Sequence, residues 1–148
     1  MIMDSLLEFA DGADISQSAG TYLSTNVVDL QEARDIGNGQ PLYLVIQIDA
    51  AVTSGGSATV QFRLRSDSVA AVHDTTSTGH SDSGAIAVAS LVAGYQIIVP
   101  LPPEGSVTYE RYLGVQAIIA TATTTAGTYS AFLTLDPAGN KSYPDATN

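Results

Sequence analysis

The chain has 148 residues, of which 5 are Lys or Arg and 15 are Asp or Glu, so its formal net charge is −10. A surface this acidic repels nucleic-acid phosphates and anionic lipid headgroups, which argues against both as direct partners. The absence of cysteine excludes disulfides, thiolate catalysis and cysteine-ligated zinc. The hydrophobic fraction of 45% predicts a folded domain with a sizeable core.

The start of the chain does not resemble a targeting segment. The first ten residues have no positive stretch and are interrupted by Asp4 and Glu8, unlike a signal peptide. No run approaches the roughly 20 apolar residues that a membrane helix needs. We therefore expect a soluble protein made in the cytoplasm of its producing cell.

Alternation of apolar and polar residues dominates the chain and predicts short strands. It begins weakly at residues 6–10 and 26–30. Residues 42–49 carry an aliphatic side chain at every even position, and residues 58–65 alternate completely. The remaining strands are expected at 85–91, 95–101, 112–121 and 129–135. Short strands separated by Gly, Pro, Asn and Asp clusters predict an all-β sandwich or barrel.

The predicted core consists of apolar residues that share one face of these strands. Its members are Leu44, Ile46, Ile48, Val60, Phe62, Leu64, Val115, Ile119, Leu133 and Leu135. The polar residues between Val60, Phe62 and Leu64 should point to solvent or to a partner.

Two connections have the composition of hairpin turns. Residues 50–57 are Gly-rich and separate two predicted strands, and residues 123–127 separate the last two. Residues 30–36 could form a helical turn, and 72–84 are expected to be an exposed polar loop. The pattern predicts one domain over 1–136 and a surface or mobile tail over 137–148.

Two histidines with neighbouring carboxylates suggest a metal site. They are His73 with Asp74 and His80 with Asp82, all within the predicted loop. No third ligand has a recognisable spacing, and a flexible loop offers no supporting shell. We therefore predict no metal site, and alanine at all four positions should change stability by no more than about 0.5 kcal/mol.

No catalytic or cofactor motif stands out. The Ser54-Gly55-Gly56-Ser57 stretch lacks the pattern of a nucleophile elbow, and Gly37-Asn38-Gly39 is too short for a dinucleotide fingerprint. The acidic residues near predicted strand ends are Asp49, Asp67, Glu104 and Glu110. Nothing singles out two of them as the carboxylate pair of a glycosidase, and they do not have the spacing of a calcium-binding loop. The sequence predicts a protein that is not an enzyme and needs no cofactor.

Three features are candidates for a protein interface. The segment with Leu6, Leu7 and Phe9 is apolar, although an edge strand of the sandwich explains it slightly better. Arg63 and Arg65 share one strand face and could meet an acidic partner, while internal ion pairs explain them at least as well. The aromatic residues in predicted loop or tail segments are Tyr22 and Tyr143.

The chain resembles a family of phage proteins in a series of short segments. They are Leu6-Leu7-Glu8-Phe9-Ala10-Asp11, Ser24-Thr25-Asn26-Val27-Val28-Asp29-Leu30, Ala33-Arg34-Asp35-Ile36-Gly37, Gly39-Gln40-Pro41-Leu42-Tyr43-Leu44-Val45-Ile46, Ser83-Gly84-Ala85-Ile86 and Leu91-Val92-Ala93-Gly94-Tyr95. In these segments it resembles the capsid cement, or decoration, proteins of tailed bacteriophages, of the podophage type with a jelly-roll fold. The resemblance spans residues 3 to about 136.

The resemblance implies an antiparallel jelly-roll β-sandwich that binds the outside of the assembled phage head. Such a protein bridges major capsid subunits and stabilises the shell, without catalysis or cofactor. It would be found on the virion exterior, and in the host cytoplasm during assembly. We expect a homo-oligomer, a dimer first and a trimer second, because a symmetric clamp offers repeated patches to a symmetric shell.

Two other classes compete with this interpretation. A carbohydrate- or receptor-binding β-sandwich module usually displays clustered aromatics, whereas this chain has no Trp and few loop aromatics. An enzyme built on a β-sandwich would need an acid–base constellation that the sequence does not display.

Overall fold

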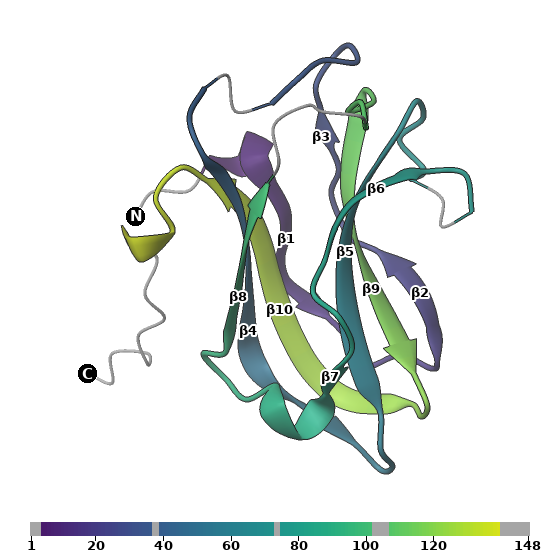
Figure 1. Ribbon diagram of the computed structural model, residues 1–148. Helices are drawn as coiled ribbons and strands as arrows, with labels where there is room; N and C mark the ends of the chain where they lie inside the picture. Colours follow the sequence, from purple (N-terminus) through teal and green to yellow (C-terminus); the bar gives the residue numbers. More distant parts are fainter. Residues whose placement is uncertain (1–3, 37–38, 73–74, 102–106, 140–148) are drawn as a thin grey trace.

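The computed structural model describes residues 4–36, 39–72, 75–101 and 107–139 (Figure 1). They form two antiparallel sheets packed face to face, which confirms the predicted β-sandwich. Sheet A has the strand order β1-β10-β4-β8. Its strands are β1 (Glu8–Asp14), β4 (Leu42–Ser54), β8 (Gln96–Leu101) and β10 (Thr124–Thr134).

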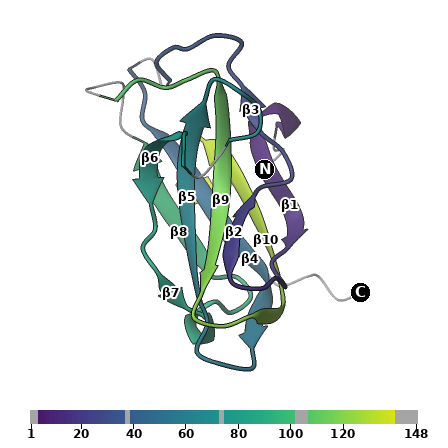
Figure 2. The same cartoon turned by 90° about the vertical axis from the view of Figure 1, so that its right-hand side faces the viewer.

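Sheet B has the main strand order β2-β9-β5-β6, with β3 also pairing with β9 and β7 with β5. Figure 2 looks onto this sheet, with sheet A behind it. Its strands are β2 (Gly20–Leu23), β3 (Val28–Asp29), β5 (Thr59–Asp67), β6 (Thr78–Asp82), β7 (Ile86–Ala87) and β9 (Tyr112–Ala120). Three short 3₁₀ turns complete the described structure: η1 (Ser5–Leu7), η2 (Val88–Ser90) and η3 (Pro137–Gly139).

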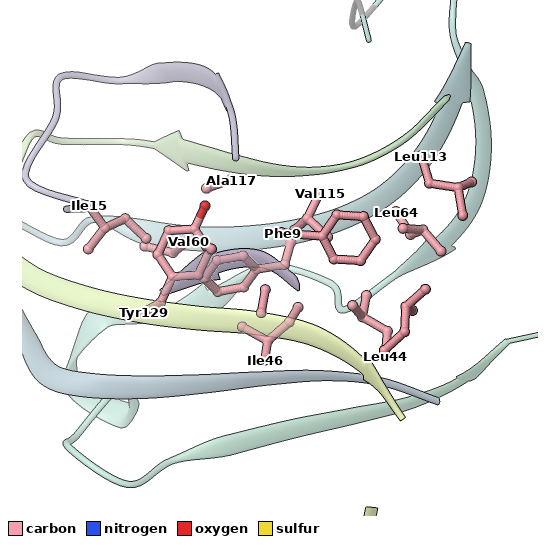
Figure 3. Close-up of a cluster of buried hydrophobic side chains, with 14 of the residues drawn as sticks. Phe9, Ile15, Leu44, Ile46, Val60, Leu64, Leu113, Val115, Ala117 and Tyr129 are labelled. Carbon is pink, nitrogen blue, oxygen red and sulfur yellow. The ribbon is translucent and has the colours of Figure 1, made fainter. Parts of the chain in front are cut away.

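The hydrophobic core fills the space between the sheets (Figure 3). Nine of the ten predicted core residues are buried there, because strand alternation directs every second side chain inward. The exception is Leu135, which is 57% exposed because it follows the last residue of β10. The aromatic rings of Phe62 and Tyr129 meet across the core, with centroids 5.1 Å apart.

Both predicted hairpins are wrong. β4 pairs with β10 and β8, whereas β5 pairs with β9, β6 and β7, so residues 55–58 cross from one sheet to the other. Residues 121–123 make the same kind of crossing between β9 and β10, with Thr121 at a φ of 74°. Alternation along a strand fixes which side chains share a face. It does not fix whether the next strand in the chain pairs with it in the same sheet or lies in the opposite sheet.

Other local expectations also change. β6 lies inside the predicted loop 72–84, and β2 was not predicted at all; both are short, and β6 is polar. The strand expected over 85–91 has only two strand residues before η2. Residues 31–36 contain bends and no helix.

The domain boundary at residue 136 stays a prediction, because residues 140–148 lie outside the described chain. In the described part, no helix is both long and apolar enough to cross a membrane.

Candidate docking face

The outer face of sheet A carries a row of apolar side chains. Phe132 on β10 pairs with Val45 on β4, and Val45 pairs with Ile98 on β8. Their chain neighbours, such as Leu44 and Leu133, belong to the core, so this row points away from sheet B. Tyr43 and Pro100 form the adjacent pair on the same face. We call Tyr43, Val45, Ile98, Pro100 and Phe132 the apolar patch.

The apolar patch is partly buried and partly open. Val45 is fully buried and Phe132 is 5% exposed, whereas Ile98 is 45% exposed. η1 contacts β10 near the patch, since β1 begins at Glu8, which pairs with Phe132. Leu6 in η1 is 76% exposed. The open residues could therefore be covered by a partner without unfolding the sheet.

η1 is held in place by its N-terminal cap. The Asp4 side chain accepts a hydrogen bond from the Leu6 backbone N–H at 3.0 Å. The Asp4 carbonyl accepts another from the Leu7 N–H at 2.9 Å. Because the turn is fixed in this way, the apolar side chains of η1 remain exposed at a defined place beside β10.

The rest of the same face is polar and internally satisfied. The Gln96 amide donates to Gln47 at 2.9 Å, and the Gln47 amide donates to Asp49 at 3.2 Å. The Ser130 hydroxyl donates to the other carboxylate oxygen of Asp49 at 2.7 Å and accepts from the Gly12 N–H at 3.0 Å. This chain of hydrogen bonds marks where the apolar patch ends.

The residues of the predicted N-terminal contact are partly exposed and partly buried in the structure. Leu6 and Leu7 are exposed, but Phe9 is buried in the core, so its prediction as an interface residue is wrong (Figure 3). A register shift between Glu8 and Ala10 lets both Phe9 and Ala10 reach the core. The alternative explanation, an edge strand of the sandwich, holds from Glu8 onward because β1 is the edge of sheet A.

Arg63 and Arg65 lie on β5 in sheet B, on the other side of the molecule. The Arg63 guanidinium is 2.9 Å from the Asp82 carboxylate, which also accepts from Gln61 at 2.6 and 2.7 Å. Arg65 donates to the hydroxyl and carbonyl oxygens of Ser77 at 2.7 and 2.6 Å. Both arginines are thus engaged within the chain, and they do not form one site with Leu6 and Leu7.

His80 is part of a structural cluster on β6. Its Nε2 lies 2.7 Å from the Ser66 hydroxyl, and its ring stacks on Tyr109 with centroids 4.0 Å apart. Burial, with the nearby Arg65 charge, lowers the pKa of His80. In the described part of the chain, no three His or acidic side chains gather as a metal site. His73 and Asp74 lie outside that part.

The Ser66–His80 pair does not form an open catalytic site. Ser66 is fully buried, and its hydroxyl accepts the Glu110 backbone N–H at 3.0 Å, so a substrate has no access to it. Asp67, 6% exposed, accepts from Val69 N–H and Thr76 at 3.4 and 3.3 Å. The cluster joins the segment before β9 to β5 and β6.

The remaining sequence candidates are dispersed. Asp49 belongs to the polar network on sheet A, and the Tyr22 hydroxyl on β2 donates to the Ser18 carbonyl at 3.0 Å. Glu104 and Tyr143 lie outside the described residues.

Sequence reasoning missed the apolar patch, although a signal was present. Residues 42–46 and 131–133 are apolar at consecutive positions, so both faces of these strands are apolar. Such a run indicates a strand covered on both sides.

Comparison with known proteins adds one match. The family model described as Bbp16 matches residues 9–133, which span most of both sheets. A search of curated proteins found no match. From the extent of the family match, the chain belongs to the Bbp16 family.

Proposed function

We propose that this protein is a structural component of a phage virion. It binds the outside of the assembled head and bridges major capsid subunits, which stabilises the shell. The proposal gives it no enzymatic activity and no cofactor. The resemblance of its sequence to cement proteins motivates this role, and the family name hints at a phage-related protein.

The observation that carries the proposal is the apolar patch with η1 beside it. Ile98 is 45% exposed on the outer face of sheet A, and Leu6 and Leu7 in η1, which contacts β10, are 76% and 39% exposed. Covering such side chains removes apolar area from water, which drives association. We therefore propose that the apolar patch and η1 dock on the capsid.

The strand order supports a jelly-roll form of the sandwich. Strands that follow one another in the chain lie in opposite sheets: β1 and β2, β4 and β5, and β9 and β10. The main path of each sheet has four strands, as in a jelly roll. A sandwich tied by many long-range pairings loses little conformational freedom on docking, so more of the contact energy remains for binding.

The acidity of the chain suits an outer position. A net charge of −10 disfavours contact with packaged DNA and keeps particles apart in solution. A clamp that binds the assembled shell but not free subunits stabilises the shell by mass action. We expect a dimer, or else a trimer, because bridging needs at least two capsid contacts.

The test uses virions that lack the protein. They should release DNA at lower temperature or lower shear, and adding the wild-type protein should restore them. The Leu6→Asp/Ile98→Asp double variant should fold but fail to restore them, because it places charges in the docking face. Val69→Asp is the matched control, since Val69 is 54% exposed and lies two residues after β5, a strand of the other sheet.

Two outcomes would refute the proposal. The first is that virions are equally robust without the protein. The second is that the double variant restores them as well as Val69→Asp does. Light scattering should also give a mass above the 15.3 kDa of one chain.

A glycan array tests the competing carbohydrate-binding role. Tyr95, at 37%, is the most exposed aromatic side chain in the described residues. Sugar-binding faces usually present several aromatic rings together, so we expect no specific glycan signal.

A further inference from the structure

A cavity of about 270 Å³ opens at the side of the sandwich where β1 and β2 are the edge strands. β1 pairs with β10 and β2 pairs with β9, so neither strand bonds to the other across this opening. The walls of the cavity come from both sheets and from the segment that joins β1 to β2. Its apolar lining residues are Ala13, Ile15, Leu23, Ala117 and Ile119.

Tyr129 on β10 supplies a polar group at the inner wall of this cavity. Its side chain is 3% exposed, and Figure 3 shows its hydroxyl pointing across the core toward Ala117 and the opposite sheet. Within the described residues, no group forms a hydrogen bond with this hydroxyl. Tyr22 at the rim differs, because its hydroxyl is bonded to the Ser18 carbonyl.

The Tyr129 hydroxyl is not fully enclosed, so water or a ligand in the cavity can pair with it. Burial also raises the pKa of Tyr129 to about 12, so the hydroxyl keeps its proton and can donate as well as accept. A ligand with a polar tip on an apolar body would satisfy both the hydroxyl and the apolar walls.

The rim of the cavity is negatively charged. Asp14 lines it, and hydrogen bonds from Ser16 lower the pKa of Asp14, so the carboxylate stays ionised at neutral pH. Asp11 is exposed on the same strand. Among the described lining residues there is no Lys or Arg. The rim therefore favours a cationic neighbour over an anionic one.

We propose that this cavity binds a tyrosine side chain carried on a basic, extended segment of a partner protein. The phenol ring fills the apolar cavity, and its hydroxyl pairs with that of Tyr129. Flanking Lys or Arg residues meet Asp14 at the rim. Asn26 donates to the Phe9 and Glu8 carbonyls and so closes one end of the β1 edge. The rest of that edge, beside Ala13, and the outer edge of β2 suit an extended segment, which can bond to strand backbones. This site is separate from the apolar patch and does not depend on the capsid role.

The experiment titrates three matched, end-blocked tripeptides, Lys-Tyr-Lys, Lys-Phe-Lys and Glu-Tyr-Glu, into the full-length protein. Methyl NMR signals of Ile15 and Ile119 report binding, up to about 10 mM peptide because a single anchored side chain binds weakly. We expect Lys-Tyr-Lys to bind about five- to tenfold more tightly than Lys-Phe-Lys, which lacks the hydroxyl. Glu-Tyr-Glu should bind more weakly, and salt should reduce the difference.

Two variants and a control assign the effect to the cavity. Tyr129→Phe keeps the ring and should abolish the preference for tyrosine over phenylalanine. Ala13→Leu fills the cavity mouth and should abolish binding of both peptides. Ala50→Leu, at an exposed position on β4, should bind like the wild type. Far-UV circular dichroism confirms that each variant is folded.

Several results would overturn the proposal. These are no methyl shifts with any peptide, equal binding of Lys-Tyr-Lys and Lys-Phe-Lys by the wild type, or no change in Ala13→Leu. Shifts confined to exposed acidic residues would mean charge attraction alone. Free 4-methylphenol binding as tightly as Lys-Tyr-Lys would replace the partner segment with a small phenolic ligand.

Discussion

The outer faces of the two sheets differ in how their side chains are covered. On sheet B, Arg63 pairs with Asp82, and the loop after β5 covers Gln116, whose amide donates to the Val72 carbonyl at 3.0 Å. On sheet A, Phe132 and Val45 are buried while Ile98 beside them remains half exposed. The middle of sheet B is covered by its own chain, although Leu23 on β2 is 38% exposed, whereas sheet A leaves part of its apolar row open.

This difference indicates which face is available for association. A face whose charges already have partners gains little from a new one, because each docking contact would first break an internal hydrogen bond. An apolar face gains from any cover that excludes water. The following predictions test this contrast, from the largest expected effect to the smallest.

Replacing Phe132 should have the largest effect. Phe132→Ala removes a nearly buried ring from the apolar patch and should destabilise the isolated protein by about 3 kcal/mol. Ile98→Ala, on the same row, should cost only about 1 kcal/mol because nearly half of that side chain is already in water. Urea denaturation followed by circular dichroism measures both. Equal costs would show that the patch is not divided into covered and open parts.

Adding a methyl group to Gly114 should disturb the cover of sheet B. A Cβ at Gly114 would lie 2.7 Å from Leu23 Cδ1 and 3.2 Å from Val72 Cγ2. The partly exposed Leu23 methyl can turn away, but the buried Val72 side chain must shift, so we expect Gly114→Ala to cost about 1 kcal/mol through overpacking, measured as a lower midpoint of thermal unfolding. Gly79→Ala is the control, since a Cβ there meets no atom within 4 Å. If both variants behave alike, the loop does not pack tightly on this face.

His80 should make stability depend on pH. Because burial lowers its pKa from 6.5, the folded chain takes up a proton less readily than the unfolded chain. Its contribution is therefore complete above pH 6.5 and is lost as the pH falls below that value. Denaturation midpoints from about pH 7 to about pH 5 should fall in the wild type and fall less in His80→Phe.

The contacts of His80 also revise the expectation that it is dispensable. His80→Ala removes the stack on Tyr109 and the bond to Ser66, so we expect a cost of about 1 kcal/mol or more at neutral pH. A loss within about 0.5 kcal/mol, as for an ordinary surface residue, would contradict this assignment.

The Arg63–Asp82 pair should have the smallest effect. Both side chains are partly exposed, at 34% and 44%, so solvent screens their attraction. A double-mutant cycle with Arg63→Ala and Asp82→Ala should give a coupling of about 0.2–1 kcal/mol that decreases with added salt. Virion binding should be unchanged by either substitution. A loss of binding would move the docking face to sheet B.

The sequence predicted well what depends on local alternation. The inward positions of β4, β5 and β9 could be assigned because every second residue is apolar, as at Leu44, Phe62 and Val115. It predicted poorly what depends on pairing. β6 contains Gly79, His80 and Asp82 and has no apolar alternation, so only its bonds to β5 make it a strand.

The candidate sites follow the same division. Leu6 and Leu7 could be singled out because they are apolar residues before the first strand, whereas Phe9 could be placed in the core only through the register shift of β1. No sequence pattern associates Tyr129 with Ile15 and Ala117, because the cavity forms where three separate segments meet.

The sequence by itself determined an acidic, cysteine-free all-β chain and the inward face of most strands, since composition and period-two alternation are local properties. Only the tertiary structure decided which strands are neighbours. It sends β4 and β5, and likewise β9 and β10, to opposite sheets. The physical reason is that alternation fixes the orientation of side chains, whereas the partner of each backbone edge is selected by the packing of the whole sandwich.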